Sequence, residues 1–389
     1  MGSDFTAIPL IENHFSESGE ATFFSSQLPV HSGESLLRIK RESVFLFGTV
    51  WQSFSDSPEN QGAEALPNNI SPLVEKIDDP NMANDNDLLQ VVRMLDQACR
   101  EAAFFYVKGH GISESLMREV RDAAHKFFQL PHGEKMKTKM ASQSGYRGYQ
   151  TVGENITMGK RDMHESIDFF FPVQPGQYGD LGRIVEGSNL WPKYPSNFKV
   201  LLENHISLLK DLSRKIMRGI ALALGGPIDA FEGAVAGDSF WALRLVSYPA
   251  LADIPEDLRT DTGLGPHTDY GFLTLVNQDD DICGLEVQNR NGQWIQAKPI
   301  PGTFVCNIGD MLKVWSNGIY QPTLHRVINN SPRSRLSAVF FYEPNFDTAI
   351  VPADVCKEKT GGAAKYKKMV YGEHLVQKLL STFPGINPN

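Results

Sequence analysis

Residues 265–276 read GPHTDYGFLTLV, a stretch in which a possible metal-binding pair leads directly into a predicted β-strand. In an extended segment, side chains two residues apart face the same side, so the imidazole of His267 and the carboxylate of Asp269 could bind one ion. The same spacing occurs in His132-Gly133-Glu134, but that pair follows the helix-ending Pro131 and has no predicted strand around it. The pair at 267–269 is therefore the stronger candidate.

A third candidate ligand lies in another predicted strand. His325 follows Asp269 by 56 residues, inside the β-like segment LHRVI at 324–328. By itself it could be a core or surface histidine that is hydrogen-bonded locally. Two histidines and one carboxylate, however, form the facial triad that binds iron(II) and leaves three adjacent coordination positions open. We therefore predict an iron site built from His267, Asp269 and His325.

Ten residues after His325 comes RLS, residues 335–337, which places an arginine and a serine on one face of a strand. The guanidinium of Arg335 can bind a carboxylate through two parallel hydrogen bonds, and the hydroxyl of Ser337 adds a third donor. An isolated pair of this kind could equally form a surface salt bridge. Beside a predicted metal site, it indicates a place for a carboxylate ligand.

The secondary-structure pattern changes near the middle of the chain. Apolar residues recur every three or four positions over about 86–102 and 196–224, which predicts two helices with one buried face each. After Phe240 the pattern becomes one of short strands, and Asn291-Gly292 is typical of a hairpin turn. The predicted strands cover 241–248, 272–276, 284–288, 294–297, 303–308, 324–329 and 336–342, and a final helix covers about 366–380. We expect an α+β protein whose mainly β core is a small barrel or sandwich flanked by helices.

These patterns divide the chain into four predicted regions. Residues 1–69 form a variable segment with a disordered insertion, because most of it is rich in Ser, Glu, Gly and Asn and shows no sustained period. Residues 70–240 form a helical region that packs on the barrel. Residues 241–345 hold the metal and its carboxylate ligand, and residues 346–389 form a C-terminal helical segment.

Composition restricts the partners and the compartment. A formal net charge of −9 and a pI near 5.6 argue against nucleic acid or an anionic membrane as the main partner. The four cysteines are widely spaced, which favours a reducing compartment. No apolar run approaches the roughly 20 residues that span a bilayer. We expect a monomer in the cytoplasm, or also in the nucleus, that acts on a small molecule.

Taken together, these motifs resemble the plant-type 2-oxoglutarate and iron(II)-dependent dioxygenases, which are related to isopenicillin N synthase. The resemblance covers about residues 70–380. The segments that carry it are AFFYV at 103–107, GHGI at 109–112, HTD at 267–269, HRV at 325–327 and RLS at 335–337. The family implies a double-stranded β-helix, or jelly roll.

The resemblance also implies the cofactors. His267, Asp269 and His325 would bind Fe(II), and Arg335 and Ser337 would hold the far carboxylate of 2-oxoglutarate. Tyr248 matches a family tyrosine that often assists this co-substrate. Dioxygen would be the second co-substrate, with ascorbate as a supporting reductant. The chain departs from the family at Val246, where an asparagine is usual, so one polar contact near 2-oxoglutarate is missing or replaced.

The implied reaction couples the decarboxylation of 2-oxoglutarate to succinate with hydroxylation or desaturation of a small metabolite, as in plant specialised or hormone metabolism. No side-chain acid or base is required. Two alternatives remain open: an iron oxygenase of the same fold that does not consume 2-oxoglutarate, and a small-molecule binder without catalysis. Iron titration and succinate formation would separate them.

The substrate pocket is predicted from two further segments. In GYRGY, residues 145–149, Tyr146, Arg147 and Tyr149 suit the lip of a pocket, where Arg147 could meet an anionic substrate. The alternative is a glycine-bounded loop whose aromatic residues pack on the barrel. Phe340 and Phe341 alternate across a strand, so one of them, Phe341 in our interpretation, lines the pocket. Asp279–Asp281 is interpreted as a solvated turn and not as a second metal site.

Overall fold

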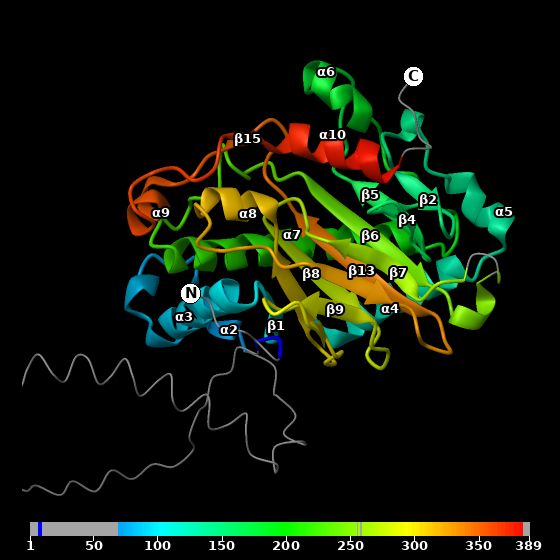
Figure 1. Cartoon of the computed structure of the whole chain (residues 1–389), viewed down its shortest axis with the longest axis horizontal. Helices are drawn as coiled ribbons and strands as arrows, with labels where there is room; N and C mark the ends of the chain where they lie inside the picture. The colour runs from blue at the N-terminus through cyan, green and yellow to red at the C-terminus, as the bar shows by residue number, and fades with distance from the viewer. Residues whose placement is uncertain (1–6, 10–68, 255, 257–258, 384–389) are drawn as a thin grey trace, which may run out of the picture. The chain divides into compact units, whose positions relative to one another are not determined.

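Two antiparallel sheets form the centre of the structure (Figure 1). The larger sheet contains, in spatial order, β1 (Phe104–Val107), β11 (Phe304–Ile308), β8 (Leu273–Gln278), β13 (Arg335–Tyr342), β6 (Trp241–Tyr248), β5 (Glu165–Phe170) and β2 (Gly148–Gln150). The smaller sheet contains β10 (Trp294–Gln296), β9 (Leu285–Gln288), β12 (His325–Ile328) and β7 (Thr262–His267). Together they make a double-stranded β-helix, as predicted.

The computed structural model describes residues 7–9, 69–254, 256 and 259–383 of the 389-residue chain. Backbone contacts divide the chain into two units, one of residues 1–12 and 67–389 and the other of residues 13–66. The predicted disordered insertion between residues 13 and 69 lies almost entirely outside the described residues. All structural statements below concern the first unit.

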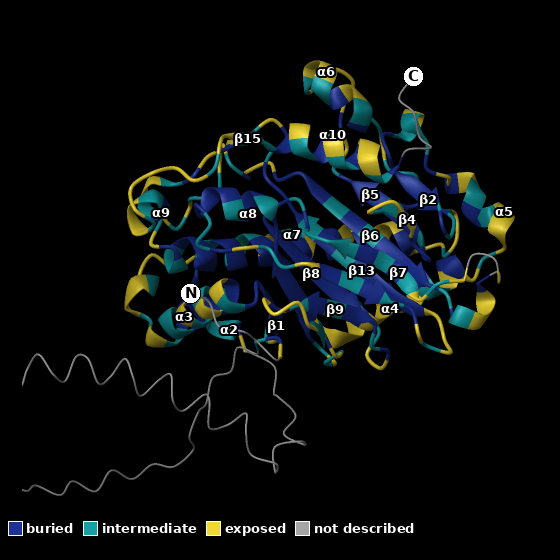
Figure 2. Ribbon diagram, viewed as in Figure 1, coloured by how far each residue is buried: buried dark blue, intermediate teal, exposed yellow. Residues whose placement is uncertain are grey.

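Side-chain alternation along β13 explains how one strand serves both the core and the site. Leu336, Ala338, Phe340 and Tyr342 belong to the large hydrophobic core between this sheet and the helices. Arg335, Ser337, Val339 and Phe341 point to the opposite side and line a cavity between the two sheets. Figure 2 shows that the large sheet is almost wholly buried.

Three amphipathic helices cover the outer face of the large sheet. They are α3 (Asn86–Glu101), α4 (Glu114–Phe128) and α7 (Phe198–Ala223), and α7 runs behind β8 and β13 in Figure 1. The side chain of Asp85 caps α3 by accepting a hydrogen bond from the amide of Leu88, 3.0 Å away. Two of these helices match the segments predicted from apolar periodicity. No helix in the described part of the chain is long and apolar enough to cross a membrane.

Short elements complete the fold. The remaining helices are α2 (Ser71–Lys76), α5 (His132–Lys135), α6 (Gly179–Gly182), α8 (Asp310–Trp315), α9 (Asp354–Lys359) and α10 (Tyr371–Thr382), and the remaining strands are β3 (Ile156–Thr157), β4 (Lys160–Arg161), β14 (Ala349–Ile350) and β15 (Met369–Val370). Single 3-10 turns are η2 (Met82–Asn84), η3 (Met136–Thr138), η4 (Ser142–Ser144), η5 (Arg183–Val185) and η6 (Leu251–Asp253). The last helix begins later than predicted because residues 369–370 pair with β14.

The two halves of the chain share the large sheet. β1, β2 and β5 come from residues 70–240, a region predicted to be mainly helical, although its aromatic and β-branched segment at 103–107 predicts the strand found as β1. β5 pairs with β6 along its whole length. β2, β5 and β7 were not among the predicted strands. The sequence of β7, TGLGPH, contains two glycines and a proline, which individually disfavour strands.

Candidate metal and co-substrate site

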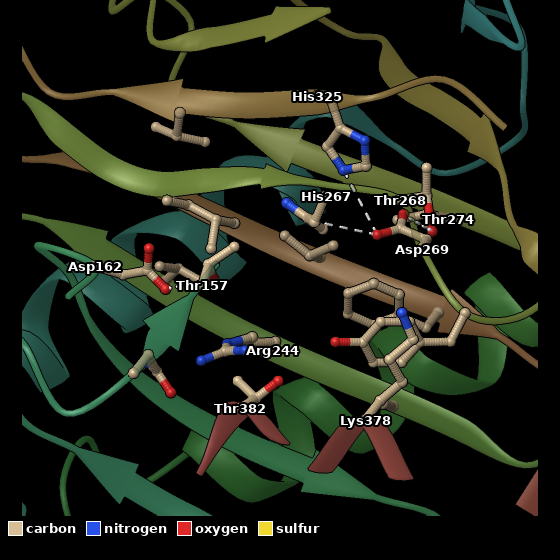
Figure 3. Close-up of a pocket in the computed structure, with 18 of the residues that line it drawn as sticks. Thr157, Asp162, Arg244, His267, Thr268, Asp269, Thr274, His325, Lys378 and Thr382 are labelled. Carbon is tan, nitrogen blue, oxygen red and sulfur yellow. Dashed lines mark hydrogen bonds and ion pairs between the residues drawn. The ribbon is translucent and has the colours of Figure 1, made fainter. Parts of the chain in front are cut away.

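The three predicted metal ligands meet at one end of the smaller sheet (Figure 3). His267 ends β7 and His325 begins β12, and the two residues are direct partners in the antiparallel pair. Asp269 follows β7 by two residues. Its Oδ1 atom lies 3.6 Å from Nε2 of His267 and 3.5 Å from Nε2 of His325. One candidate ligand atom from each residue lies within 4.8 Å of the other two.

Hydrogen bonds orient each ligand toward this centre. Nδ1 of His267 is 2.9 Å from the carbonyl oxygen of Gly265, and Nδ1 of His325 is 3.1 Å from that of Thr323. A ring that donates from Nδ1 presents the lone pair of Nε2 to a metal. Both histidines can therefore turn Nε2 toward Asp269.

Two neighbouring side chains donate hydrogen bonds to the same carboxylate oxygen of Asp269, Oδ2. The Thr274 hydroxyl and the Asn307 amide, the latter at 2.6 Å, both donate to Oδ2. Oδ1 is thereby directed to the histidines. Two imidazoles and one carboxylate on a common face are the donor set of non-haem iron(II) sites, so the residues fit this metal.

The protonation states also suit metal binding. Burial, assisted by the nearby His325, lowers the pKa of His267 to about 4, so this ring is neutral at physiological pH. Burial alone would raise the pKa of Asp269, but the two histidines and Thr274 outweigh it and keep the carboxylate ionised. Burial also opposes the charged form of His325, yet Asp269 outweighs it and raises the pKa of that ring. A bound cation would replace the proton of His325 beside Asp269.

The arginine–serine pair forms a second polar centre in the same cavity. Arg335 is paired with Tyr248 across β13 and β6, and its guanidinium carbon lies 5.2 Å from the centre of the tyrosine ring. Nη2 of Arg335 donates to Oε1 of Gln278 at 2.6 Å. Nε and Nη1 of Arg335 and Oγ of Ser337 are buried and have no hydrogen-bond partner among the described residues.

Unpaired buried donors are costly, so this arrangement is built for a ligand. Three donors on one strand face fit the far carboxylate of 2-oxoglutarate. Val246, the departure from the family pattern, lies directly opposite Ser337 on one side. Gln278 lies opposite Ser337 on the other side and supplies the polar contact to Arg335.

The metal and co-substrate residues line one cavity of about 590 Å³ between the sheets. β5, β6 and β13 form its floor, and β7, β9 and β12 form the opposite wall. α10 and the β3 hairpin complete the wall, with Lys378, Thr382 and Thr157 visible around Arg244 in Figure 3. Phe341 lines this cavity and Phe340 belongs to the hydrophobic core, a choice that strand alternation by itself left open.

Charged residues that the sequence reasoning did not select also line this cavity. Arg244 lies on the floor with its Nε atom 3.3 Å from Oδ1 of Asp168, and Asp162 accepts a hydrogen bond from the amide of Gly265 at 2.9 Å. Lys378 and Glu343 complete the set. Period-two alternation carries the signal that could have found two of them, since Arg244 is four residues before Tyr248 and Glu343 is two residues after Phe341.

The structure does not place Tyr146, Arg147 and Tyr149 at this cavity, so the prediction that they form its lip was wrong. Gly145 and Gly148 adopt positive φ angles, which only glycine tolerates easily, and the loop turns inward. Arg147 is fully buried and donates to the carbonyl oxygens of Gly145, Val185 and Phe171.

The two tyrosines are also used for packing. The Tyr149 hydroxyl donates to Glu165 at 2.6 Å, and the ring of Tyr146 packs against Phe383 with 5.8 Å between ring centres. The loop therefore follows the alternative interpretation, a glycine-bounded segment packed on the barrel.

The acidic run at 279–281 also has structural partners. Asp279 accepts a hydrogen bond from the Leu336 amide at 2.8 Å and lies 3.0 Å from His125. Asp280 pairs with Arg121, and Asp281 pairs with Arg333. The carboxylates point to different partners, and the described part of the chain contains no candidate metal cluster besides the triad.

Comparisons with known proteins agree with this geometry. The family model described as 2OG-Fe(II) oxygenase superfamily matches residues 241–344, and the model described as non-haem dioxygenase in morphine synthesis N-terminal matches residues 74–194. A rice protein named homoarginine-6-hydroxylase is 74% identical over 314 residues, which are 81% of this chain and 96% of that protein. The chain belongs to the 2OG-Fe(II) oxygenase superfamily.

Other proteins show the same relationship. A soybean homoarginine-6-hydroxylase is 57% identical over 81% of this chain and 96% of that protein. The crystal structure of a full-length Neurospora crassa protein in complex with alpha-KG and 5-formyluracil has a TM-score of 0.68 at 27% identity, and covers 83% of this chain and 98% of that one. This oxygenase therefore uses iron(II) and 2-oxoglutarate and acts on a small metabolite, as the sequence predicted.

Proposed function

We propose that this oxygenase hydroxylates homoarginine at C6 while it converts 2-oxoglutarate to succinate and carbon dioxide. The observation that carries this proposal is the 74% identity to a homoarginine-6-hydroxylase over nearly its whole length. In the proposal His267, Asp269 and His325 hold the iron, Arg335 and Ser337 hold the far carboxylate of 2-oxoglutarate, and Tyr248 packs beside it.

The charges of the cavity support this substrate. At neutral pH homoarginine carries a guanidinium, an ammonium and a carboxylate on a flexible apolar chain. The cavity contains a carboxylate, Glu343, that suits a cationic group, and a basic residue, Lys378, that suits the carboxylate of the substrate. Apolar side chains such as Phe341 and Leu375 can contact the methylene chain.

The protein's own contribution is positioning and exclusion of water. Iron(II) with dioxygen supplies the oxidant that exchanges a substrate hydrogen for a hydroxyl group. The triad would hold the iron beside the cavity, and Arg335 would fix the orientation of 2-oxoglutarate. α10 and the β3 hairpin enclose the substrate. No side-chain acid or base takes part in the proposal.

The position of hydroxylation determines the final products. C6 of homoarginine is bonded to a guanidino nitrogen, so a hydroxyl group there gives a carbinolamine. Such a group breaks its C–N bond: the hydroxyl oxygen becomes an aldehyde oxygen, and its proton ends on the departing nitrogen. Guanidine and an amino-acid aldehyde would be released.

A substrate panel tests the proposal. Purified enzyme with iron(II), 2-oxoglutarate and ascorbate is given homoarginine, arginine or lysine, and succinate and guanidine are measured by mass spectrometry. We expect homoarginine alone to accelerate succinate formation strongly. Equal rates with and without homoarginine would refute the proposed substrate, and substrate oxidation without succinate would instead indicate an oxygenase that does not consume 2-oxoglutarate.

A further inference from the structure

A buried carboxylate in the cavity has an oxygen atom without a partner. Glu343 directly follows β13 and is only 4% exposed. Its Oε2 atom has no hydrogen-bond partner within the described part of the chain. A buried carboxylate is costly unless a cation or several donors meet it. The open oxygen therefore indicates a place for a positively charged ligand.

Strand register places Glu343 next to the metal centre. Phe341 is paired with Thr274, and the Thr274 hydroxyl donates to Asp269. Glu343 is two residues after Phe341 and is the next side chain from this part of the chain that faces the cavity. It therefore lies beyond Phe341, on the side of Thr274 and Asp269 that is away from Ser337. Arg335 and Ser337 lie in the opposite direction along the same strand. The co-substrate anchor and Glu343 are thus on opposite sides of the metal.

A glycine makes room for this carboxylate. A β-carbon added at Gly271 would lie 1.1 Å from Oε2 and 2.1 Å from Cδ of Glu343. Gly271 is two residues after Asp269, so Glu343 packs against the segment that leads from this metal ligand into β8. The backbone conformation at this glycine is not left-handed, so the missing side chain matters here for space and not for φ.

The other acids of the cavity outside the triad are already engaged. Asp168 lies 3.3 Å from Nε of Arg244, and Asp162 accepts hydrogen bonds from the Thr157 hydroxyl and the Gly265 amide. Burial, together with the nearby Asp269 and Asp310, raises the pKa of Glu343 well above its ordinary value. A cation beside Glu343 would offset these effects, which a neutral ligand could not.

We infer that Glu343 binds the guanidinium group of the substrate and thereby places C6 beside the iron. The inference rests on the proposed function. A carboxylate accepts two parallel hydrogen bonds from a planar guanidinium. Because C6 is bonded directly to a guanidino nitrogen, the residue that fixes the guanidinium also fixes which carbon reaches the metal. Glu343 would then determine both the substrate preference and the position of hydroxylation.

The test compares two substrates of the same shape and different charge. Homocitrulline replaces the guanidinium of homoarginine by a neutral urea. In Glu343→Gln we expect kcat/KM for homoarginine to fall roughly 100-fold, as for the loss of one partner of a buried charge pair. Turnover of homocitrulline should stay the same or rise, because an amide can pair with a urea. Glu343→Asp, which keeps the charge with a shorter reach, should retain part of the preference for homoarginine.

Controls separate this effect from general damage. Glu373→Gln on the exposed face of α10 is a matched control variant, and its kcat/KM should equal the wild-type value for both substrates. The KM for 2-oxoglutarate and the melting temperature of Glu343→Gln should stay near the wild-type values, since the co-substrate anchor lies on the far side of the metal.

Two results would overturn the inference in distinguishable ways. Suppose that the wild-type enzyme hydroxylates homoarginine and that Glu343→Gln keeps the wild-type ratio of kcat/KM for homoarginine to kcat/KM for homocitrulline. The inference then fails and the proposed function stands. If the wild-type enzyme does not turn over homoarginine at all, the proposed function fails and the inference fails with it. Should Glu343→Gln not fold, the same comparison applies to Glu343→Asp and Gly271→Ala, which would displace the carboxylate.

Discussion

His267 and His325 face each other as direct partners in the β7–β12 pair, with 4.2 Å between their ring centres. The two residues are 58 positions apart in the sequence, and only the folded sheet brings them together. Asp269 follows β7 and turns back to the same point. The metal site is therefore a property of the smaller sheet, and its hydrogen-bonded surroundings should matter almost as much as the ligands.

Asn307 provides a test of those surroundings. Its amide donates to Oδ2 of Asp269, so Asn307→Leu should leave all three ligands in place while it frees the carboxylate to rotate. Loss of such an outer partner typically costs about 10–100-fold in metal affinity or activity. Iron titration of the purified variant checks this. Wild-type affinity for iron would mean that the hydrogen bond does not hold the ligand.

The co-substrate anchor predicts a specific kinetic change. Arg335→Lys should raise the KM for 2-oxoglutarate by roughly 10–100-fold, because an ammonium cannot form the two parallel hydrogen bonds of a guanidinium. Ser337→Ala should raise it by about 5-fold, the effect of one ordinary hydrogen bond. The KM for the oxidised substrate should change little in both. If these variants raised only the KM for the oxidised substrate and left the KM for 2-oxoglutarate unchanged, Arg335 and Ser337 would not be the 2-oxoglutarate anchor.

Arg147 should matter for stability and not for substrate binding. Arg147→Met removes the donor from three carbonyl oxygens in the protein interior, which should lower the free energy of unfolding by about 3 kcal/mol. Urea unfolding measures this loss, and KM values of the folded variant should match the wild type. A large rise in KM at unchanged stability would restore the interpretation of Arg147 as a pocket residue.

The ion pair of His125 and Asp279 predicts a pH dependence of stability. The hydrogen bond to Asp279, opposed by burial, raises the pKa of His125 above its ordinary value. A raised pKa means that the folded state binds the proton more tightly than the unfolded state. The stabilisation is complete below the unfolded pKa of roughly 6.5 and is lost as the pH rises through the folded value.

His125→Gln should therefore lower the melting temperature most at acidic pH. The difference from the wild type should shrink as the pH rises above about 6.5. Thermal unfolding between pH 5.5 and 9, monitored by circular dichroism, makes the comparison. If the difference in melting temperature between His125→Gln and the wild type grew with pH, the folded state would not favour protonated His125.

The sequence was sufficient for the parts of the site that lie on regular strands. Arg335 and Ser337 follow from period-two alternation, which holds wherever a strand is correctly identified. His325 was selected because it lies in a predicted strand and completes the triad of ligands. The helices at 86–101 and 198–223 follow from their apolar periodicity for the same reason.

The remaining parts depend on packing that no local pattern reports. The loop at 145–149 turns inward because of backbone geometry at its glycines, so its aromatic and charged residues resembled a pocket lip but are buried. β7 contains residues that disfavour strands and is held by its pairing with β12. Glu343 acquires its position only because Gly271, far away in the sequence, has no side chain.

In the proposed function this enzyme couples 2-oxoglutarate turnover to hydroxylation of homoarginine at C6. The most direct measurement is the ratio of guanidine to succinate formed in one reaction with iron(II), 2-oxoglutarate and homoarginine. We expect a ratio near one, and His267→Ala should abolish both products. Succinate without guanidine or any hydroxylated homoarginine, at the same rate as without the amino acid, would contradict the proposed function.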